Sequence, residues 1–157
     1  TPEAQRLADV GGGVLPVEDI SVDDLDAFRS NFGGKGDKVD VVVFAAPQLS
    51  IVEMQAVARL CDGQKFATAV IVCTSPQVYA DATRMGFVAT IESAGAKVLE
   101  GTCFYNQYAR EIGEANGWTR LLSNSAKIVN ILGGYGYEPA LASMEDCVAA
   151  AIAGEIQ

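Results

Sequence analysis

The chain has 157 residues, half of them hydrophobic, which is enough for one well-buried core. Its 20 acidic and 11 basic residues give a net charge of −9, and this field repels phosphate backbones and argues against general nucleic-acid binding. No run of about 18 apolar residues is present, so no membrane span is expected; there is also no histidine, which excludes Ser-His, Cys-His and His-ligated zinc chemistry within this chain.

Short β-branched runs alternate along the chain with segments of helical period, a pattern typical of βαβ units. Helix starts are marked by Ser21, by Ser50 with Glu53 three residues later, and by Ser75 before Pro76. In the first half of the chain we expect a helix over 22–32, a buried strand over 39–44, a loop over 45–50, a helix over 51–60 and a strand over 67–73. Helices over 76–85 and 87–94 come next, followed by a strand over 97–99, a turn over 101–103 and a helix over 106–115. The chain is expected to end with a short strand at 121–122, a helix that starts within 123–127 and ends at 133–135, and a last helix from 143 to 153.

Repeated strand–loop–helix units predict an α/β fold: a mostly parallel sheet flanked by helices on both faces, three-layered and Rossmann-like. We expect residues 1–157 to form a single domain of this kind. Ligands of such sheets bind beyond the carboxyl ends of the strands. Three segments leave strands at that edge, namely 45–50, 101–106 and 123–127, and we expect the functional residues there.

The segment 123–127 reads Ser-Asn-Ser-Ala-Lys and is the first candidate site. A helix start offers free N–H groups and the positive end of the helix dipole, which suit a carboxylate. Asn124 and Lys127 are therefore candidates for substrate binding, and Ser125 and Lys127 for proton transfer. A simple helix cap beside a solvated lysine is the alternative. In segment 45–50, Gln48 and Ser50 are further candidate substrate contacts, with a plain capping box as the alternative.

The four cysteines show no C-x-x-C spacing, and we interpret them as reduced thiols of a cytoplasmic protein. Cys103 follows a strand on a loop with Tyr105, where a thiol can be a metal ligand, a reactive group or a small buried hydrophobe. Cys147 lies one turn into the last helix, near the positive dipole end that favours a thiolate, but Val148 and Ala149 beside it favour a packing role. Cys61 and Cys73 are expected to be purely structural.

Five motifs follow one another in a fixed order: Pro-Gln-Leu-Ser at 47–50, Val-Cys-Thr-Ser-Pro-Gln-Val at 72–78, Gly-Thr-Cys at 101–103, Ser-Asn-Ser-Ala-Lys at 123–127, and Met-Glu-Asp-Cys-Val-Ala-Ala-Ala-Ile-Ala-Gly at 144–154. In this order they resemble the C-terminal part of the catalytic region of aconitase X, a family of iron-dependent dehydratases in the aconitase superfamily. The similarity runs from the first residues to about Gly154.

This resemblance implies a hydro-lyase acting on a small hydroxylated acid such as cis-3-hydroxy-L-proline or mevalonate 5-phosphate. Iron or an iron–sulfur cluster would act as Lewis acid on the departing hydroxyl. Cys103 would be a ligand, Cys147 a second candidate, and the remaining ligands would come from outside this chain. Asn124, Ser125 and Lys127 would hold the substrate carboxylate or take part in proton transfer. The implied partners are the rest of the catalytic region and a small swivelling domain or subunit, without which the chain is expected to be inactive.

Two departures from the family pattern are visible. Where the family has Gly-x-Pro-His, this chain has Ala-Ala-Pro-Gln at 45–48, which replaces a group that can carry charge by an amide. The residues after Lys127, Ile-Val-Asn-Ile-Leu, also lack the aromatic character common in the family. A non-catalytic anion-binding or structural module that kept the fold and lost the chemistry is therefore the alternative function.

Overall fold

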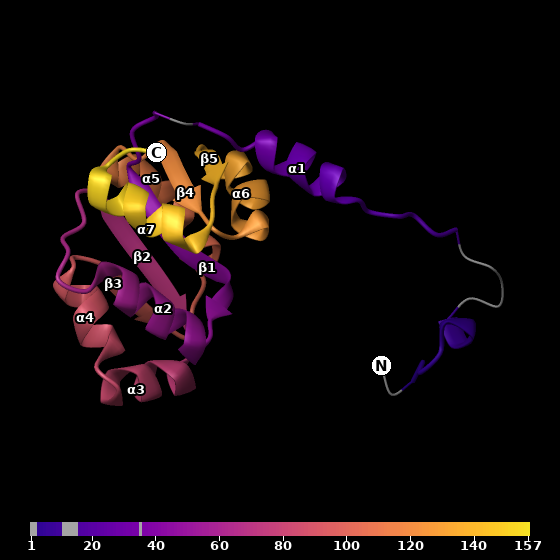
Figure 1. The fold of residues 1–157 in the computed structure, drawn as a ribbon, viewed down its shortest axis with the longest axis horizontal. Helices are drawn as coiled ribbons and strands as arrows, with labels where there is room; N and C mark the ends of the chain where they lie inside the picture. Colours follow the sequence, from indigo (N-terminus) through magenta and orange to yellow (C-terminus); the bar gives the residue numbers. More distant parts are fainter. Residues whose placement is uncertain (1–2, 11–15, 35) are drawn as a thin grey trace.

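A five-stranded parallel sheet in the order β3-β2-β1-β4-β5 forms the centre of the molecule, as shown by a computed structural model that describes residues 3–10, 16–34 and 36–157 (Figure 1). Its strands are β1 (Val41–Leu49), β2 (Ala69–Thr74), β3 (Lys97–Glu100), β4 (Arg120–Ser123) and β5 (Glu138–Leu141). The helices are α1 (Val22–Ser30), α2 (Ile51–Cys61), α3 (Pro76–Arg84), α4 (Phe87–Ser93), α5 (Ala109–Asn116), α6 (Ala126–Leu132) and α7 (Met144–Ala153), with 3₁₀ turns η1 (Leu7–Val10), η2 (Phe104–Asn106) and η3 (Gly133–Tyr135). The predicted α/β class and parallel sheet are confirmed.

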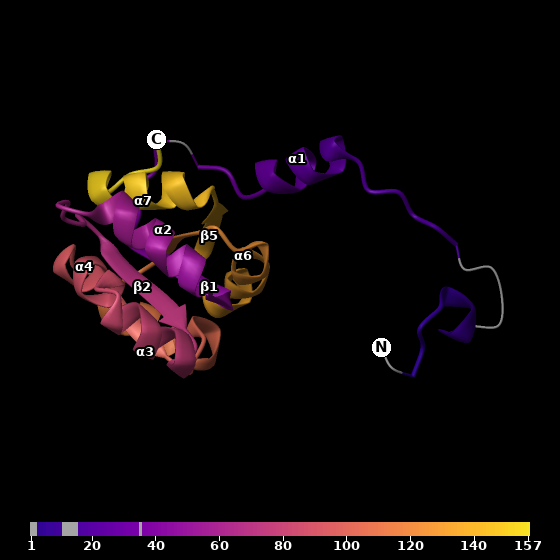
Figure 2. The ribbon, with the colours of Figure 1, turned by 60° about the horizontal axis from the view of Figure 1, so that its bottom comes forward.

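Alternate residues of the strands build two separate cores, one on each face of the sheet. On β1, Val42 and Phe44 face a core completed by α2, α4 and α7, which lie together in front of the sheet (Figures 1 and 2). Val41 and Val43 face the opposite core, which includes Phe104 and the buried side chains of α5 and α6. These strand residues are fully buried, because both faces of a parallel sheet are covered by helices.

The expectation of a loop over 45–50 is wrong, because strand β1 continues to Leu49. Pairing with β2 passes from Phe44 opposite Val72 directly to Leu49 opposite Thr74, so the intervening residues form an irregular stretch within the strand. Ala46 has a φ of 51°, and the peptide bond between Ala46 and Pro47 is cis. The β-branched run ends at Phe44 and is followed by a proline, which is why the sequence pattern favoured a loop.

Two other elements differ from the expected ones. The helix expected over 106–115 begins at Ala109, because η2 occupies the start of that segment. The strand β5 was not expected, since Glu138 and Pro139 interrupt its apolar pattern. It is nevertheless a full parallel partner of β4, pairing from Arg120 opposite Glu138 to Ser123 opposite Leu141. This edge position tolerates a proline.

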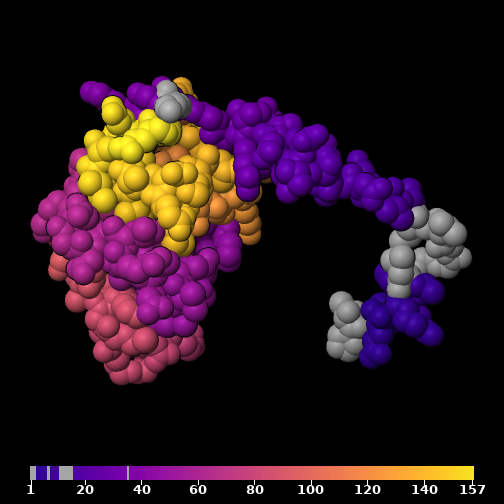
Figure 3. Space-filling model, in the orientation of Figure 1, coloured from indigo at the N-terminus to yellow at the C-terminus, as the bar shows by residue number. Residues whose placement is uncertain are grey.

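The N-terminal segment projects away from the rounded body formed by the sheet and its helices (Figures 1 and 3). The predicted helix here is confirmed as α1, with Ser21 and Asp24 in a capping box, and α1 buries none of its residues. The segment after α1 is bonded to the sheet through Arg120 of β4. The Arg120 guanidinium donates to the carbonyl of Gly33 at 2.9 Å and forms a salt bridge with Asp37 at 2.7 Å. Among the described residues, no helix has the length and apolar character that crossing a membrane requires.

Candidate functional site

The end of β1 lies between the loop that follows β3 and the start of α6. The Gln48 side-chain amide donates to the backbone carbonyl of Thr102 at 2.8 Å. The Ser125 hydroxyl donates to the backbone carbonyl of Ala46 at 2.5 Å. The three segments named from the sequence therefore meet at the carboxyl edge of the sheet, which we call the rim and define by residues 45–50, 101–106 and 123–127.

Ser125 is a buried N-cap whose hydroxyl already has two partners. Besides donating to Ala46, its Oγ accepts from the backbone N–H of Ile128 at 3.2 Å, which confirms the expected helix cap. Beneath it, the Ser123 hydroxyl accepts from the Ser125 N–H at 3.2 Å and donates to the carbonyl of Val43 at 2.6 Å. This arrangement fixes the turn that begins α6, so a proton on Ser125 reaches a substrate only if the bond to Ala46 opens.

Lys127 presents a positive charge on the exposed side of the rim. Its Nζ lies 3.5 Å from the hydroxyl oxygen of Tyr105 and 5.3 Å from the centre of the Tyr105 ring. Such a cation–π contact holds the ammonium without neutralising it. Because Tyr105 is two residues from Cys103, this contact places an exposed cation beside the cysteine loop, where it can attract an anion.

Cys103 is half-buried on a loop that is fastened on both sides. The Thr102 carbonyl is held by Gln48, and the Thr102 hydroxyl accepts from the Gln107 side-chain amide at 2.5 Å. The carbonyl of Cys103 itself accepts from the Asn106 N–H at 2.9 Å. Its side chain packs against the core that includes the buried residues of α5 and α6, and the residue stays partly exposed.

The structure does not bring Cys147 to this rim. Cys147 is fully buried in the opposite core, among α2, α7 and the strand residues that face them. Burial raises the pKa of the Cys147 thiol, and the neighbouring carboxylates of Asp146 and Glu145 raise it further. The packing role that the sequence favoured for Cys147 is therefore confirmed, and burial outweighs any effect of the α7 dipole on its thiol. Cys147 and Cys103 lie in cores on opposite faces of the sheet.

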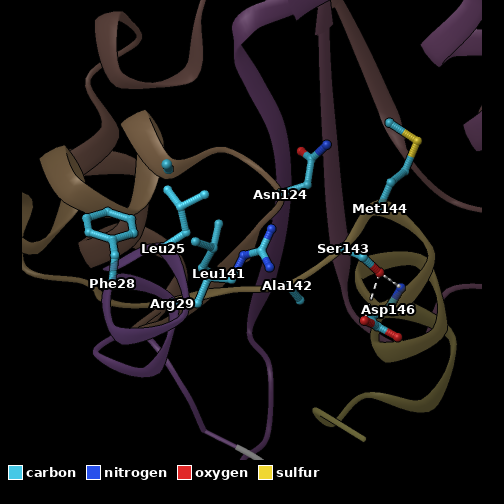
Figure 4. A pocket seen from close by; sticks show the side chains of 10 residues that line it. Leu25, Phe28, Arg29, Asn124, Leu141, Ala142, Ser143, Met144 and Asp146 are labelled. Carbon is cyan, nitrogen blue, oxygen red and sulfur yellow. Dashed lines mark hydrogen bonds between the residues drawn. The ribbon is translucent and has the colours of Figure 1, made fainter. Parts of the chain in front are cut away.

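Ser50 and Asn124, the two remaining candidate substrate contacts, lie in different surroundings. The exposed Ser50 hydroxyl donates to the Glu53 carboxylate at 2.7 Å and completes the capping box of α2. Asn124 lines a pocket of about 650 Å³ between α1 and the start of α7 (Figure 4). The same pocket holds Arg29 and the Ser143 cap, whose hydroxyl donates to Asp146 at 2.7 Å.

Cys73 is fully buried near the end of β2, as expected of a structural residue, and lies in the same core against which Cys103 packs. Phe104, from the loop that follows β3, is buried in the same core. Within the described ranges, no group of three or more His, Cys, Asp or Glu side chains is arranged to hold a metal ion.

Comparisons with known proteins give one consistent result. A family model described as the aconitase X third domain matches residues 39–153. The chain is 31% identical over 160 residues to a cis-3-hydroxy-L-proline dehydratase of Pseudomonas aeruginosa, covering 98% of this chain and 27% of that protein. It is 26% identical over 122 residues to the large subunit of a phosphomevalonate dehydratase of Methanocaldococcus jannaschii, covering 78% of this chain and 29% of that protein.

The fold also matches a solved structure. The crystal structure of Thermococcus kodakaraensis aconitase X in its holo-form superposes with a TM-score of 0.68 and 20% sequence identity, over 82% of this chain and 33% of that chain. At this identity the match shows the fold. The chain thus spans about a third or less of the length of the proteins it matches.

Proposed function

The chain belongs to the aconitase X family, and we propose that it forms the third domain of a dehydratase that removes water from a small hydroxylated carboxylic acid. The observation that carries this proposal is the meeting of Cys103, Ser125 and Lys127 at one rim of a chain that matches this family over residues 39–153. The relatives are dehydratases named for cis-3-hydroxy-L-proline and phosphomevalonate, and either kind of acid suits an exposed lysine.

Cys103 is the proposed ligand of iron or an iron–sulfur cluster. The donor chemistry fits, because a thiol that is partly exposed at a rim is the soft ligand that iron in such clusters prefers. The described part of the chain holds no complete ligand set, so the other ligands are proposed to come from elsewhere in the enzyme. Bound iron would supply Lewis acidity toward the departing hydroxyl.

Lys127 and Asn124 are the proposed contacts of the substrate carboxylate. The Lys127 ammonium is exposed and oriented by Tyr105, and Asn124 lies next to the cap of α6. Ser125 and Lys127 are the proposed groups for proton transfer, Ser125 after release of its bond to Ala46. Gln48 and Ser50 already bond to Thr102 and Glu53, so we propose that any contact of theirs with substrate is secondary to positioning the rim.

Activity is proposed to need the rest of the catalytic region and a small swivelling domain or subunit, as the limited coverage of the relatives supports. The whole of residues 1–157 is proposed to act as one domain of that assembly. All four cysteines are free thiols, which supports a cytoplasmic location.

Dehydration by the full-length protein tests this function, with product followed by mass spectrometry for each of the two acids. Lys127→Met is expected to raise KM at least tenfold, since it removes the carboxylate's cation, whereas Lys97→Met, at an exposed lysine on β3, leaves KM unchanged. Cys103→Ala is expected to lower the iron content. Normal iron and normal turnover in Cys103→Ala would refute the ligand assignment.

A non-catalytic module is the second candidate, and one observation favours it. The amide of Gln48, which stands where the family carries a histidine, is bonded to Thr102 and serves the loop rather than a ligand. This candidate predicts no iron after anaerobic purification and only weak carboxylate binding near Lys127. Stoichiometric iron would exclude it.

A further inference from the structure

Helix α1 carries an apolar stripe that is exposed to solvent. Val22, Leu25 and Phe28 follow one another at intervals of three residues, which places them along one side of the helix. Their exposed fractions are 71%, 51% and 36%, and α1 buries none of its residues. Just before the helix, Val17 and Ile20 are 83% and 75% exposed. Single exposed apolar residues are common on protein surfaces, but a run of them on one segment is typical of an interaction surface.

The chain that leaves α1 is bonded to the sheet. The carbonyl of Phe32 accepts from the Leu141 N–H at 2.9 Å, at the edge of β5, and the carbonyl of Gly33 accepts from Arg120 of β4. The ring of Phe28, on the last turn of α1, lies 5.1 Å from the ring of Phe32, measured between their centres. These contacts keep the apolar stripe beside the edge of β5.

The stripe forms one wall of a groove whose other wall is also apolar. Leu25 and Phe28 line the pocket of about 650 Å³ from the side of α1, while Leu141 of β5 and Met144 of α7 line it from the body (Figure 4). Asn124, a proposed substrate contact at the rim, lines the same pocket. A segment seated in this groove would contact both apolar walls and would reach the rim at Asn124.

The rest of the catalytic region is the occupant that the comparisons favour. The alignment with the cis-3-hydroxy-L-proline dehydratase covers 98% of this chain, and so includes α1, but it covers only 27% of that protein. Most of such an enzyme therefore lies outside this chain and is available to cover the stripe. The model of the third domain begins at residue 39, so α1 stands outside the part of the family that this model describes.

The charges on α1 indicate what borders the docked segment. The helix has acidic side chains at Asp23, Asp24 and Asp26, and all three are exposed. Basic side chains complement such a surface, since like charges placed against it would be repelled. An apolar segment with Lys or Arg at its borders therefore suits both the stripe and its surroundings.

We infer that the apolar stripe of α1 and the groove beside it form a docking surface for an apolar segment, bordered by basic side chains, from the rest of the catalytic region. The inference deepens the proposed function, because it names the surface through which this domain joins its partner next to Asn124. It rests on that function for the existence of the partner.

Amide hydrogen exchange over residues 22–30, followed by mass spectrometry, tests the inference without an enzyme assay. In the chain of residues 1–157, α1 is expected to exchange fast, because a helix of nine residues without buried side chains is marginal in water. In the full-length protein its exchange is expected to be slower by about tenfold or more, since docking protects the helix. Equally fast exchange in the two proteins would overturn the inference.

Leu25→Gln in the full-length protein is expected to restore fast exchange, because it places an amide in the apolar interface. Ala27→Gln is the matched control: residue 27 is exposed two positions further along, away from the stripe, and the variant gains the same good helix former. It is expected to leave the exchange slow. Peptides from β1 and β2 check that the body stays folded. Slow exchange in Leu25→Gln, or fast exchange in Ala27→Gln, would refute the assignment of the stripe.

Two other occupants give different results in the chain of residues 1–157. Slow exchange of α1 at every protein concentration means that α1 closes on its own groove. Exchange that slows only as the concentration rises means that a second copy of the chain docks there. Either result would overturn the inference.

The docking surface and the enzyme assignment fail in different ways. A protected α1 in a full-length protein that dehydrates neither acid refutes the enzyme assignment and leaves the docking surface standing. An active, iron-loaded full-length protein whose α1 exchanges as fast as in residues 1–157 refutes the docking surface and leaves the enzyme assignment standing.

Discussion

The Gln48 side-chain amide donates a hydrogen bond of 2.8 Å to the backbone carbonyl of Thr102, and this bond fastens the end of β1 to the loop that carries Cys103. The bond is partly buried, so water does not fully replace it when it is lost. The same loop is held by a second hydrogen bond, which the Gln107 side-chain amide donates to the Thr102 hydroxyl at 2.5 Å. The position of Cys103 thus depends on two glutamines that sequence patterns did not mark as structural.

Gln48→Glu is expected to destabilise the chain by about 1–3 kcal/mol, because it sets a carboxylate against a carbonyl oxygen. Released from β1, the loop is also expected to expose Cys103, so alkylation of Cys103 by iodoacetamide becomes faster. Gln64→Glu adds the same charge at an exposed position after α2 and is the control for net charge. Equal urea midpoints and equal alkylation rates in the two variants would contradict this role of Gln48.

Ser125→Ala is expected to cost about 1–3 kcal/mol, because it removes both a helix cap and the donor to the Ala46 carbonyl. Ser75→Ala removes only a cap, the bond from the Val78 N–H at 3.2 Å, and is expected to cost about 1 kcal/mol. Urea unfolding of both variants measures the difference. If Ser75→Ala proved as costly as Ser125→Ala, the Ala46 bond would contribute nothing to stability.

Gly113→Ala is expected to destabilise α5 by about 1–3 kcal/mol through overpacking. A β-carbon at Gly113 would meet the Tyr137 hydroxyl oxygen at 2.7 Å, and that hydroxyl is itself held at 2.7 Å by the carbonyl of Ala109. Gly133→Ala is the control, since its β-carbon meets no atom within 4 Å and its φ of −55° is helical. That change is expected to be neutral or to raise the melting temperature slightly, and the reverse order of melting temperatures would refute the packing argument.

Tyr137 is expected to make stability fall at alkaline pH. Burial raises the pKa of the Tyr137 phenol above its ordinary value of about 10. The folded state therefore favours the neutral phenol, so its contribution is fully present below about pH 10 and is lost as the pH rises through the folded-state pKa.

The pH dependence of urea midpoints separates this group from the other tyrosines. Tyr137→Phe is expected to be less stable than the parent at pH 7 by about 1 kcal/mol, through loss of the bond to Ala109, and to show a shallower decline above pH 10. Tyr108→Phe, at a side chain that is 77% exposed, is expected to follow the parent at every pH. A parent profile that stays flat above pH 10 would contradict the burial argument.

Most elements could be predicted because their causes are local. Ser21, Ser50 and Ser75 cap the helices they were expected to cap, since a hydroxyl three residues before a free N–H needs no tertiary partner. The strand β5 and the last part of β1 could not be predicted, because Pro139 and Pro47 disrupt the local pattern. Both segments are strands only because a neighbouring strand offers its backbone, β4 for β5 and Thr74 for the end of β1.

The sequence by itself determined the α/β class, the capped helix starts and the three segments of the rim, because period, capping and strand-end chemistry act over a few residues. It also named Cys103 and Lys127. Only the tertiary structure decided which cysteines share a core. The order β3-β2-β1 and the alternation of strand residues place Cys73 in the core against which Cys103 packs, and Cys147 lies in the core on the opposite face of the sheet. That choice depends on contacts between residues far apart in the chain, which no local pattern contains.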